Sequence, residues 1–212
     1  MSTITPDALM LLGTNCPFCP AVLDGLTQLV KKGLIGKLEV INLEVQPETA
    51  RHLGVRSVPW VRIGPFELEG QQTPAELAAW AERAASDEGI KEYLAELINT
   101  AGIHKAEQLI ESTPAYFLYL LDLITDDETS LNIKIGIGAL MEMLAESGIM
   151  HTYTDELGAL TSHASPQVRI DACHYLSLTG DAATSTYIKP LLEDTDPQVV
   201  EVARESLDTL GS

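Results

Sequence analysis

Residues 8–19 read Ala-Leu-Met-Leu-Leu-Gly-Thr-Asn-Cys-Pro-Phe-Cys, and this stretch decides the fold of the first part of the chain. Five consecutive apolar residues ended by Gly13 are typical of a short buried strand. After the second cysteine, apolar residues recur at helical spacing until Gly33, at Val22, Leu26, Leu29 and Val30. The two cysteines therefore lie between a strand over residues 8–12 and a helix predicted over residues 17–32.

This position gives the two cysteines different expected roles. A sulfur at the start of a helix is close to free amide groups and to the positive end of the helix dipole, which favour a thiolate. We expect Cys16 to be this thiolate, because only a thiolate attacks a disulfide. A second thiol one helical turn later resolves the mixed disulfide, and Cys19 takes that role. Pro17 and Pro20 stiffen the turn between and after the sulfurs.

The rest of the first part continues the alternation of strands and helices. We expect a strand over 38–43, a short helix over 47–53, and a hairpin of strands 58–63 and 66–68 joined by Gly64-Pro65. Thr73-Pro74-Ala75-Glu76 has the residues of a helix N-cap, a first-turn proline and a capping box, so a final helix extends to about residue 85. The order predicts an α/β domain.

This order resembles the thioredoxin and glutaredoxin family, in which a strand, Cys-x-x-Cys, a helix and a later Val-Pro pair follow one another. The resemblance covers residues 5 to about 86. Cys16-Pro17-Phe18-Cys19-Pro20 is also similar to small modules of protein disulfide oxidoreductases and peroxide-reductase electron donors. The resemblance implies that Pro59 is cis and faces the cysteines, and that Val58 offers its backbone to a substrate strand.

By the same resemblance, the expected substrate-binding residues are Pro17, Phe18, Val58, Pro59 and Trp60. A Trp on a strand is as often part of the core, and for Trp60 both interpretations stay open.

We do not expect a metal site or a cofactor other than a redox-active Cys16–Cys19 disulfide. Zinc normally needs four ligands, and the chain has no second Cys-x-x-Cys. The third cysteine, Cys173, lies in a helical pattern and is expected to be a small core residue. We do not expect Cys173 to bind a metal together with His163 and His174. Cys173 and His174 are adjacent, and the side chains of adjacent helix residues point about 100° apart, so the two would not face one metal ion.

The charge divides the chain into two parts. The formal net charge is −18, of which residues 1–87 contribute −3 and residues 88–212 contribute −15. The pattern after residue 87 is helical throughout. We therefore predict a redox domain over 1–87 and an acidic, all-α domain over 88–212.

The all-α part contains an internal repeat. Ser165-Pro166-Gln167-Val168 matches Asp196-Pro197-Gln198-Val199 at a spacing of 31, each copy opening with an N-cap and a proline. The match continues with Ala172 over Ala203 and Leu176 over Leu207. A fainter third copy lays Ile133-Lys134-Ile135 over Val168-Arg169-Ile170, with Ile137 over Ala172 and Met141 over Leu176. This part resembles HEAT-like repeats, which implies about four stacked helix pairs.

The acidity limits the choice of partner. Nucleic acid and anionic membranes would be repelled. The acids are either a solvated outer surface or a face for a basic client protein. The residues of that face would be Glu107, Glu111, Asp126, Asp127 and Glu128.

The segment before Cys16 lacks a signal-type pattern, and no apolar run approaches about 18 residues, so we expect a cytoplasmic protein.

Three functions compete at this point. The first is a thiol-disulfide oxidoreductase that acts on client proteins through Cys16 and Cys19, receives electrons from a dithiol reductase, and selects clients through its helical repeats. The second is a redox-sensing adaptor whose thioredoxin-like part senses or binds without turnover. The third is a glutathione-dependent glutaredoxin.

Overall fold

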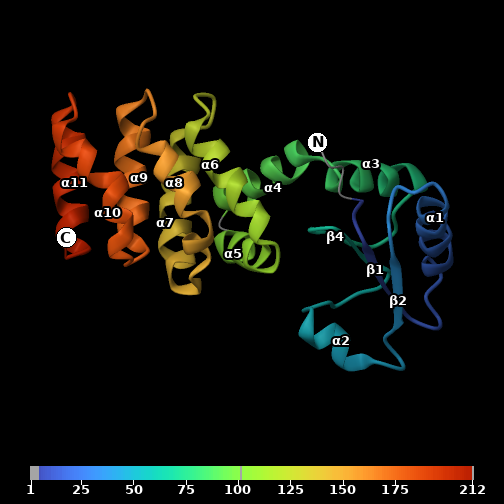
Figure 1. Ribbon diagram of the computed structural model, residues 1–212. Coiled ribbons are helices and arrows are strands. Elements are labelled where there is room, and N and C mark those ends of the chain that lie inside the picture. Colours follow the sequence, from blue (N-terminus) through green and yellow to red (C-terminus); the bar gives the residue numbers. More distant parts are fainter. Residues whose placement is uncertain (1–4, 101, 212) are drawn as a thin grey trace. The chain divides into compact units, whose positions relative to one another are not determined.

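The computed structural model describes residues 5–100 and 102–211, which fold into a mixed sheet with helices followed by a helical part (Figure 1). This is the layout, α/β and then all-α, that the sequence predicts. The chain divides into a first unit that ends at Glu92 and a second that begins at Tyr93. The division falls inside α4 (Asp87–Asn99), a few residues beyond the change in charge.

The sheet of the first unit has the strand order β2-β1-β3-β4. β1 is parallel to β2 and antiparallel to β3, and β3 is antiparallel to β4. Met10 and Leu11, which point to opposite faces of β1, are both 0% exposed, so the central strand is buried on both sides. The strands are β1 (Ala8–Leu12), β2 (Leu38–Asn42), β3 (Trp60–Ile63) and β4 (Phe66–Glu69).

Among the described residues, three helices lie wholly within the first unit, and two of them form its core with the sheet. The helices are α1 (Cys19–Lys31), α2 (Pro47–His52) and α3 (Pro74–Ala84). α1 and α3 pack closely at Gly25, where an added Cβ would lie 2.8 Å from a methyl carbon of Leu77. The ring of Trp80 on α3 lies 5.1 Å from that of Phe66 on β4. By contrast, α2 buries none of its residues.

Two predicted starts were wrong, and proline explains both. α1 begins at Cys19 and not at Pro17, because Pro20 has no N–H to donate to the carbonyl of Cys16 and the first turn closes from Val22 to Phe18. β3 begins at Trp60 and not at residue 58, because Pro59 cannot donate to the strand ladder. The predicted ends at residues 32, 43 and 53 are each one residue too late, and the predicted end of the last strand at residue 68 is one residue too early.

The capping box of α3 is confirmed. The Thr73 hydroxyl accepts the N–H of Glu76 at 3.3 Å, and the Glu76 carboxylate accepts the N–H of Thr73 at 2.7 Å. The hydrogen bond from the Thr73 backbone holds the pKa of Glu76 below its usual value. The start of α3 is therefore set by residues within one helical turn.

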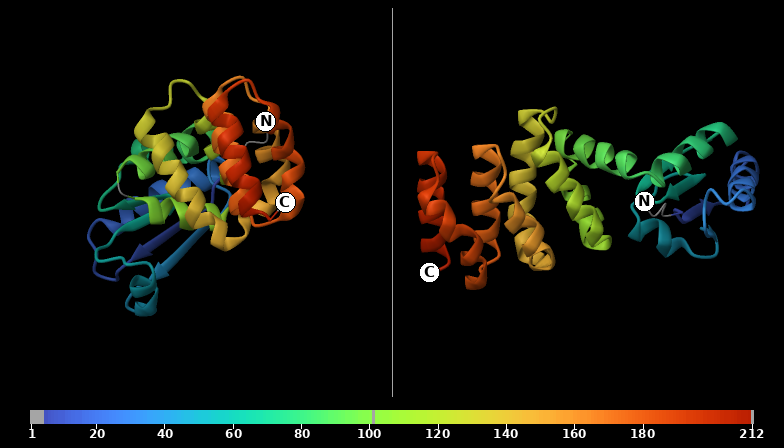
Figure 2. Two further views of the ribbon diagram at one scale, coloured as in Figure 1. Left: turned by 90° about the vertical axis from the view of Figure 1, so that its left-hand side faces the viewer. Right: turned by 45° about the horizontal axis from the view of Figure 1, so that its top comes forward.

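The second unit is a row of helices. After α4 come α5 (Ile103–Ser112), α6 (Phe117–Thr125), α7 (Leu131–Ser147), α8 (Thr154–Leu160), α9 (Pro166–Leu178), α10 (Ser185–Ile188) and α11 (Pro197–Thr209). Three pairs follow one another, α6 with α7, α8 with α9, and α10 with α11. Their second helices pack side by side in the order α7, α9, α11 (Figures 1 and 2).

The repeat seen in the sequence corresponds to equivalent buried positions in this row. Pro166 and Pro197 each lie in the first turn of their helix. The N-caps differ, because the Asp196 side chain accepts the N–H of Gln198 while Ser165 makes no such bond. Six matched apolar positions of α7, α9 and α11 are buried: Ile137, Met141, Ala172, Leu176, Ala203 and Leu207. At the start of the third copy the match fails, because Ile135 is 64% exposed.

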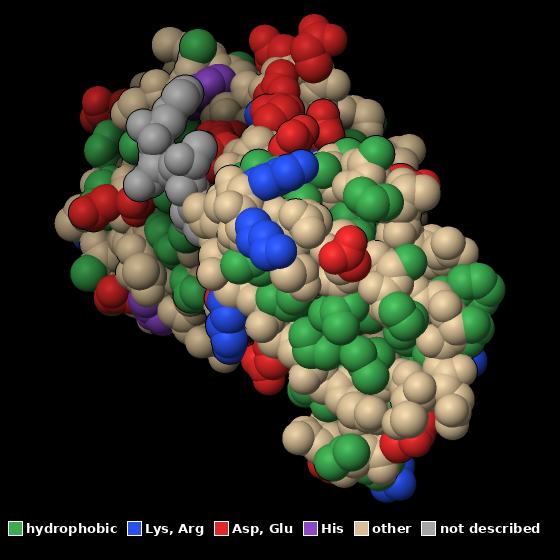
Figure 3. All heavy atoms as spheres, turned by 90° about the vertical axis from the view of Figure 1, so that its right-hand side faces the viewer, with side chains coloured by type: hydrophobic (Ala, Val, Ile, Leu, Met, Phe, Trp, Pro, Cys, Tyr) green, Lys and Arg blue, Asp and Glu red, His purple; other side chains and the backbone are tan. Residues whose placement is uncertain are grey.

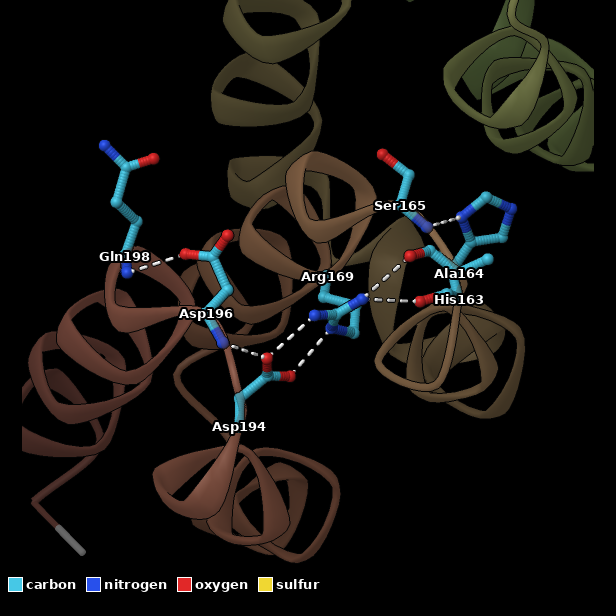
Figure 4. Close-up of polar contacts among 7 residues, drawn as sticks. All are labelled: His163, Ala164, Ser165, Arg169, Asp194, Asp196 and Gln198. Atoms are coloured by element: carbon cyan, nitrogen blue, oxygen red, sulfur yellow. Dashed lines mark hydrogen bonds and ion pairs between the residues drawn. The ribbon is translucent and has the colours of Figure 1, made fainter.

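An arginine joins the loops before α9 and α11 (Figure 4). Arg169 donates two hydrogen bonds of 2.7 Å to the carboxylate of Asp194 and two more to the carbonyls of His163 and Ala164. The hydrogen bond with Arg169 lowers the pKa of Asp194. Both side chains are largely buried, at 12% and 8% exposed, so this pair links consecutive repeats.

Within residues 5–100 and 102–211, none of the helices combines the length and the apolar character needed to cross a membrane.

Candidate functional site

The two cysteines of the first unit form a disulfide at the start of α1. Their Cα atoms are 5.5 Å apart. Cys16 lies just before the helix and is partly exposed, whereas Cys19 is the first residue of the helix and only 3% exposed. An external thiol or disulfide can therefore reach the sulfur of Cys16 far more readily than that of Cys19.

The backbone of the helix start faces the accessible sulfur. The N–H of Cys19 points to the Sγ of Cys16 at a distance of 3.1 Å. This amide belongs to the first turn, where amides have no partner inside the helix and carry the positive end of its dipole. The contact favours negative charge on Cys16 over negative charge on the buried Cys19.

The loop between β1 and α1 is held by the loop that follows β2. The N–H of Thr14 donates to Oε1 of Glu44 at 2.9 Å, and the hydroxyl of Thr14 accepts from Nδ2 of Asn42 at 3.0 Å. The Asn42 amide oxygen in turn accepts the N–H of Glu44 at 2.9 Å. We call Thr14, Asn42 and Glu44 the loop clasp. It adds two residues to the site that sequence reasoning missed, because they lie about 30 positions from the loop they hold.

The segment around Pro59 lies beside the same loop. The Val58–Pro59 bond is cis, as the family resemblance implies. An added Cβ at Gly13 would lie 3.5 Å from a methyl carbon of Val58 and 4.0 Å from Cβ of Cys16. The structure thus brings the side chains of Val58 and Cys16 next to the same point beside Gly13.

The predicted substrate-binding residues differ in how much surface they offer. Pro17 is exposed, and Phe18 is 50% exposed. Pro59 is buried, and Trp60 is only 2% exposed, so Trp60 is a core residue in this structure. Phe18 is one of the large hydrophobic side chains at the surface of the first unit, together with Val30, Val40 and Val45. Figure 3 shows one face of the molecule, on which hydrophobic side chains reach the surface among charged ones.

Cys173 is a buried residue of α9 and is 0% exposed. Burial raises the pKa of its thiol to about 12, which leaves it protonated and unreactive near neutral pH. Near it in sequence, His163 accepts the N–H of Ser165 through Nδ1, and His174 lies 3.8 Å from a carboxylate oxygen of Glu142 on α7. In the described part of the chain, no three His, Cys, Asp or Glu side chains are grouped so that they could hold a metal ion.

The acids proposed as a partner face lie at the surface of the second unit. Glu111, Asp126, Asp127 and Glu128 are exposed, and Glu107 is partly exposed. Asp126 accepts the N–H of Glu128 at 2.9 Å in the turn before α7. These carboxylates are thus open to solvent or to a partner.

The chain matches no protein-family model and no curated protein.

Proposed function

We propose that the chain is a thiol-disulfide oxidoreductase whose first unit has a thioredoxin-like fold and whose redox group is the Cys16–Cys19 pair. The observation that carries the proposal is the asymmetry of the pair, with one sulfur accessible and facing a free helix amide and the other buried. The strand order, with one parallel and two antiparallel pairings and a cis proline before β3, supports the fold assignment.

The proposed reaction moves two electrons from the reduced pair to a client disulfide. The Cys16 thiolate attacks one client sulfur, forming a mixed disulfide and releasing the other client sulfur, which takes a proton. The Cys19 thiol then gives up its proton to solvent and attacks Cys16. This step releases the second client thiolate and leaves the Cys16–Cys19 disulfide. An external dithiol reductase, or glutathione, returns the pair to the dithiol.

The client is proposed to bind around the exposed sulfur. Pro17 and Phe18 offer exposed apolar surface next to Cys16. Val58 and Cys16 both lie beside Gly13, and the peptide group of Val58 is proposed to pair there with an extended client segment. Pro59 restricts the backbone next to Val58. The side chain of Trp60 is buried in the core at the start of β3, so it is proposed to stabilise this segment without contacting the client.

The second unit is proposed to select the client. Its exposed carboxylates would attract a basic protein surface and speed its encounter. Such binding weakens with added salt, because charges at a surface are screened beyond about 10 Å at 0.1 M salt. Measured binding that does not change between low and moderate salt would argue against this role.

The exposed acidic unit also supports a second function, in which the chain is a redox-sensing adaptor and the cysteine pair reports oxidation without turnover. This version predicts a stable stoichiometric partner complex with a negligible rate of disulfide reduction. A glutathione-dependent enzyme, in turn, would show activity with glutathione alone and need no flavoprotein reductase.

The decisive experiment uses insulin as a model disulfide and the full-length chain reduced by dithiothreitol. We expect the unmodified chain to accelerate insulin reduction. Cys19→Ser should stop turnover by the pair and, when reduced and freed of dithiothreitol before mixing, accumulate a covalent complex with insulin, because no thiol is then present to release it. Cys16→Ser is the matched control and should give neither turnover nor complex. A complex formed by Cys16→Ser and not by Cys19→Ser would reverse the roles, and the absence of both turnover and complex would remove the enzymatic proposal.

A further inference from the structure

The loop clasp places one negative charge beside the cysteine pair. Glu44 reaches from the loop after β2 to the N–H of Thr14, two residues before Cys16. An added Cβ at Gly13 would lie 3.8 Å from Oε1 of Glu44 and 4.0 Å from Cβ of Cys16. The carboxylate of Glu44 and the side chain of Cys16 therefore both lie next to the position that a side chain of residue 13 would occupy.

The clasp also fixes the conformation of the loop. The Cys16 N–H donates to the carbonyl of Gly13 at 3.2 Å, which makes a turn out of residues 13–16. Thr14 lies within that turn and is held by both its amide and its hydroxyl. Without the carboxylate of Glu44, Thr14 would be held only by the hydrogen bond between its hydroxyl and Asn42.

We propose that Glu44 is a positioning residue that also sets the reducing power of the Cys16–Cys19 couple, an inference that rests on the redox function proposed above. Its two effects are separable. As a hydrogen-bond acceptor, Glu44 holds the loop that carries Cys16. As a charge, it opposes the thiolate on Cys16 and so favours the disulfide over the reduced pair.

The sign of the charge effect follows from Coulomb's law. At the dielectric constant of water, about 80, two like charges roughly 8 Å apart repel enough to move a titration by about half a pH unit. The thiolate exists only in the reduced form, so repulsion raises the energy of the reduced form alone. The carboxylate therefore makes the pair a stronger reductant than the helix start would by itself.

Other charged groups near the site do not share this contact. In the described part of the chain, the hydrogen bonds of residues 13–16 involve one charged side chain, that of Glu44. The segment of Val58 carries the exposed Arg56, whose cation would act in the opposite direction. Glu48, on α2, is exposed and lies outside the clasp, which makes it a matched control for loss of a negative charge.

The test separates charge from geometry with three variants of the full-length chain and the Glu48→Gln control. Glu44→Gln keeps an oxygen acceptor for Thr14 and removes the charge. Asn42→Ala removes a neutral member of the clasp and keeps the charge. Glu44→Ala removes both the acceptor and the charge. The first readout is the rate of iodoacetamide reaction with Cys16 against pH, and the second is the equilibrium of the pair with reduced and oxidised glutathione.

In that equilibrium two glutathione thiols supply two electrons and become glutathione disulfide while the protein disulfide becomes a dithiol. For Glu44→Gln we expect the midpoint of the alkylation profile to fall by about half a pH unit. The equilibrium should then move about threefold toward the reduced pair, which is about 14 mV for a two-electron couple. Glu48→Gln should leave both quantities unchanged, and Asn42→Ala, which loosens the loop but keeps the charge, should not lower the midpoint as Glu44→Gln does.

Amide hydrogen exchange at Thr14 reports the geometry independently. We expect protection of this amide to be lost in Glu44→Ala and kept in Glu44→Gln, because only the alanine lacks an acceptor. A Glu44→Gln profile identical to that of the unmodified chain, or an equal shift in Glu48→Gln, would overturn the inference. If the unmodified chain forms no reversible Cys16–Cys19 disulfide in the glutathione buffer, the proposed function fails and the inference fails with it.

Discussion

Gly158→Ala in α8 tests the packing that joins two consecutive repeats. Gly158 is buried beneath the ring of Tyr187, which lies on α10. An added Cβ would lie 2.4, 2.5 and 2.8 Å from three carbons of that ring. An aromatic ring moves only as a whole, and this one is tied back to α8 by the hydrogen bond from its hydroxyl to Asp155, at 2.5 Å. The methyl group therefore has no room unless the ring shifts by about 1 Å, toward an ordinary carbon contact.

The expected magnitude is the sum of two opposing effects. Alanine is favoured over glycine inside a helix by about 1 kcal/mol. Forcing a methyl group into a well-packed site costs about 1–3 kcal/mol. We therefore expect Gly158→Ala to lower the free energy of unfolding by about 1 kcal/mol. In a Tyr187→Ala background the clash is gone, and the same substitution should stabilise the protein by up to about 1 kcal/mol.

The assay is urea unfolding of the full-length chain followed by far-ultraviolet circular dichroism, with hydrogen exchange of α8–α11 peptides to assign the change to the second unit. Gly138→Ala is the matched control, because an added Cβ there would meet only the Tyr175 hydroxyl at 3.8 Å, an ordinary contact. It should stabilise the protein. The reasoning is refuted if Gly158→Ala stabilises as much as Gly138→Ala, or if the Gly158 and Tyr187 effects are additive.

Cys173, Asp194 and Thr73 each give a further testable prediction. Because burial raises the pKa of Cys173 to about 12, the folded, reduced chain should be alkylated at Cys16 and not at Cys173 at neutral pH, and at all three thiols only in denaturant; modification of Cys173 in the native state would contradict this burial. Since the hydrogen bond with Arg169 lowers the pKa of Asp194 below its ordinary 3.8, that stabilisation is complete above this pH and lost as the pH falls through the lowered pKa. Asp194→Asn should therefore reduce thermal stability at neutral pH and flatten its decline on the acid side, and an unchanged acid slope would exclude the carboxylate as its source. Thr73→Ala should cost about 1 kcal/mol in urea unfolding through loss of the N-cap of α3, whereas Thr73→Ser, which keeps the hydroxyl, should cost less.

Much of the fold could be predicted because the residues that decide it are close in sequence. The capping box joins Thr73 and Glu76, three positions apart, and it starts the helix where the sequence indicates. The buried strand before Gly13 and the matched buried positions of α9 and α11 follow from apolar patterns alone. The predicted starts of α1 and β3 were wrong by two residues each, because proline removes a hydrogen bond at each place.

The candidate site could be predicted only in its local part. Cys16 and Cys19 are three positions apart, so their motif and their place before a helix could be read directly. The sequence left Trp60 open between a groove and the core, because a strand residue alternates between faces and only the packed sheet shows which face is covered.

The sequence by itself determined the cysteine pair, the alternation of strands and helices before residue 87 and the repeat of 31 residues after it, because each depends on contacts within a few positions along the chain. Only the tertiary structure decided what surrounds them. Glu44 meets Thr14 across 30 positions, and Arg169 meets Asp194 across 25. Such contacts arise when packed elements bring distant loops together, and a single sequence carries no local pattern that marks them.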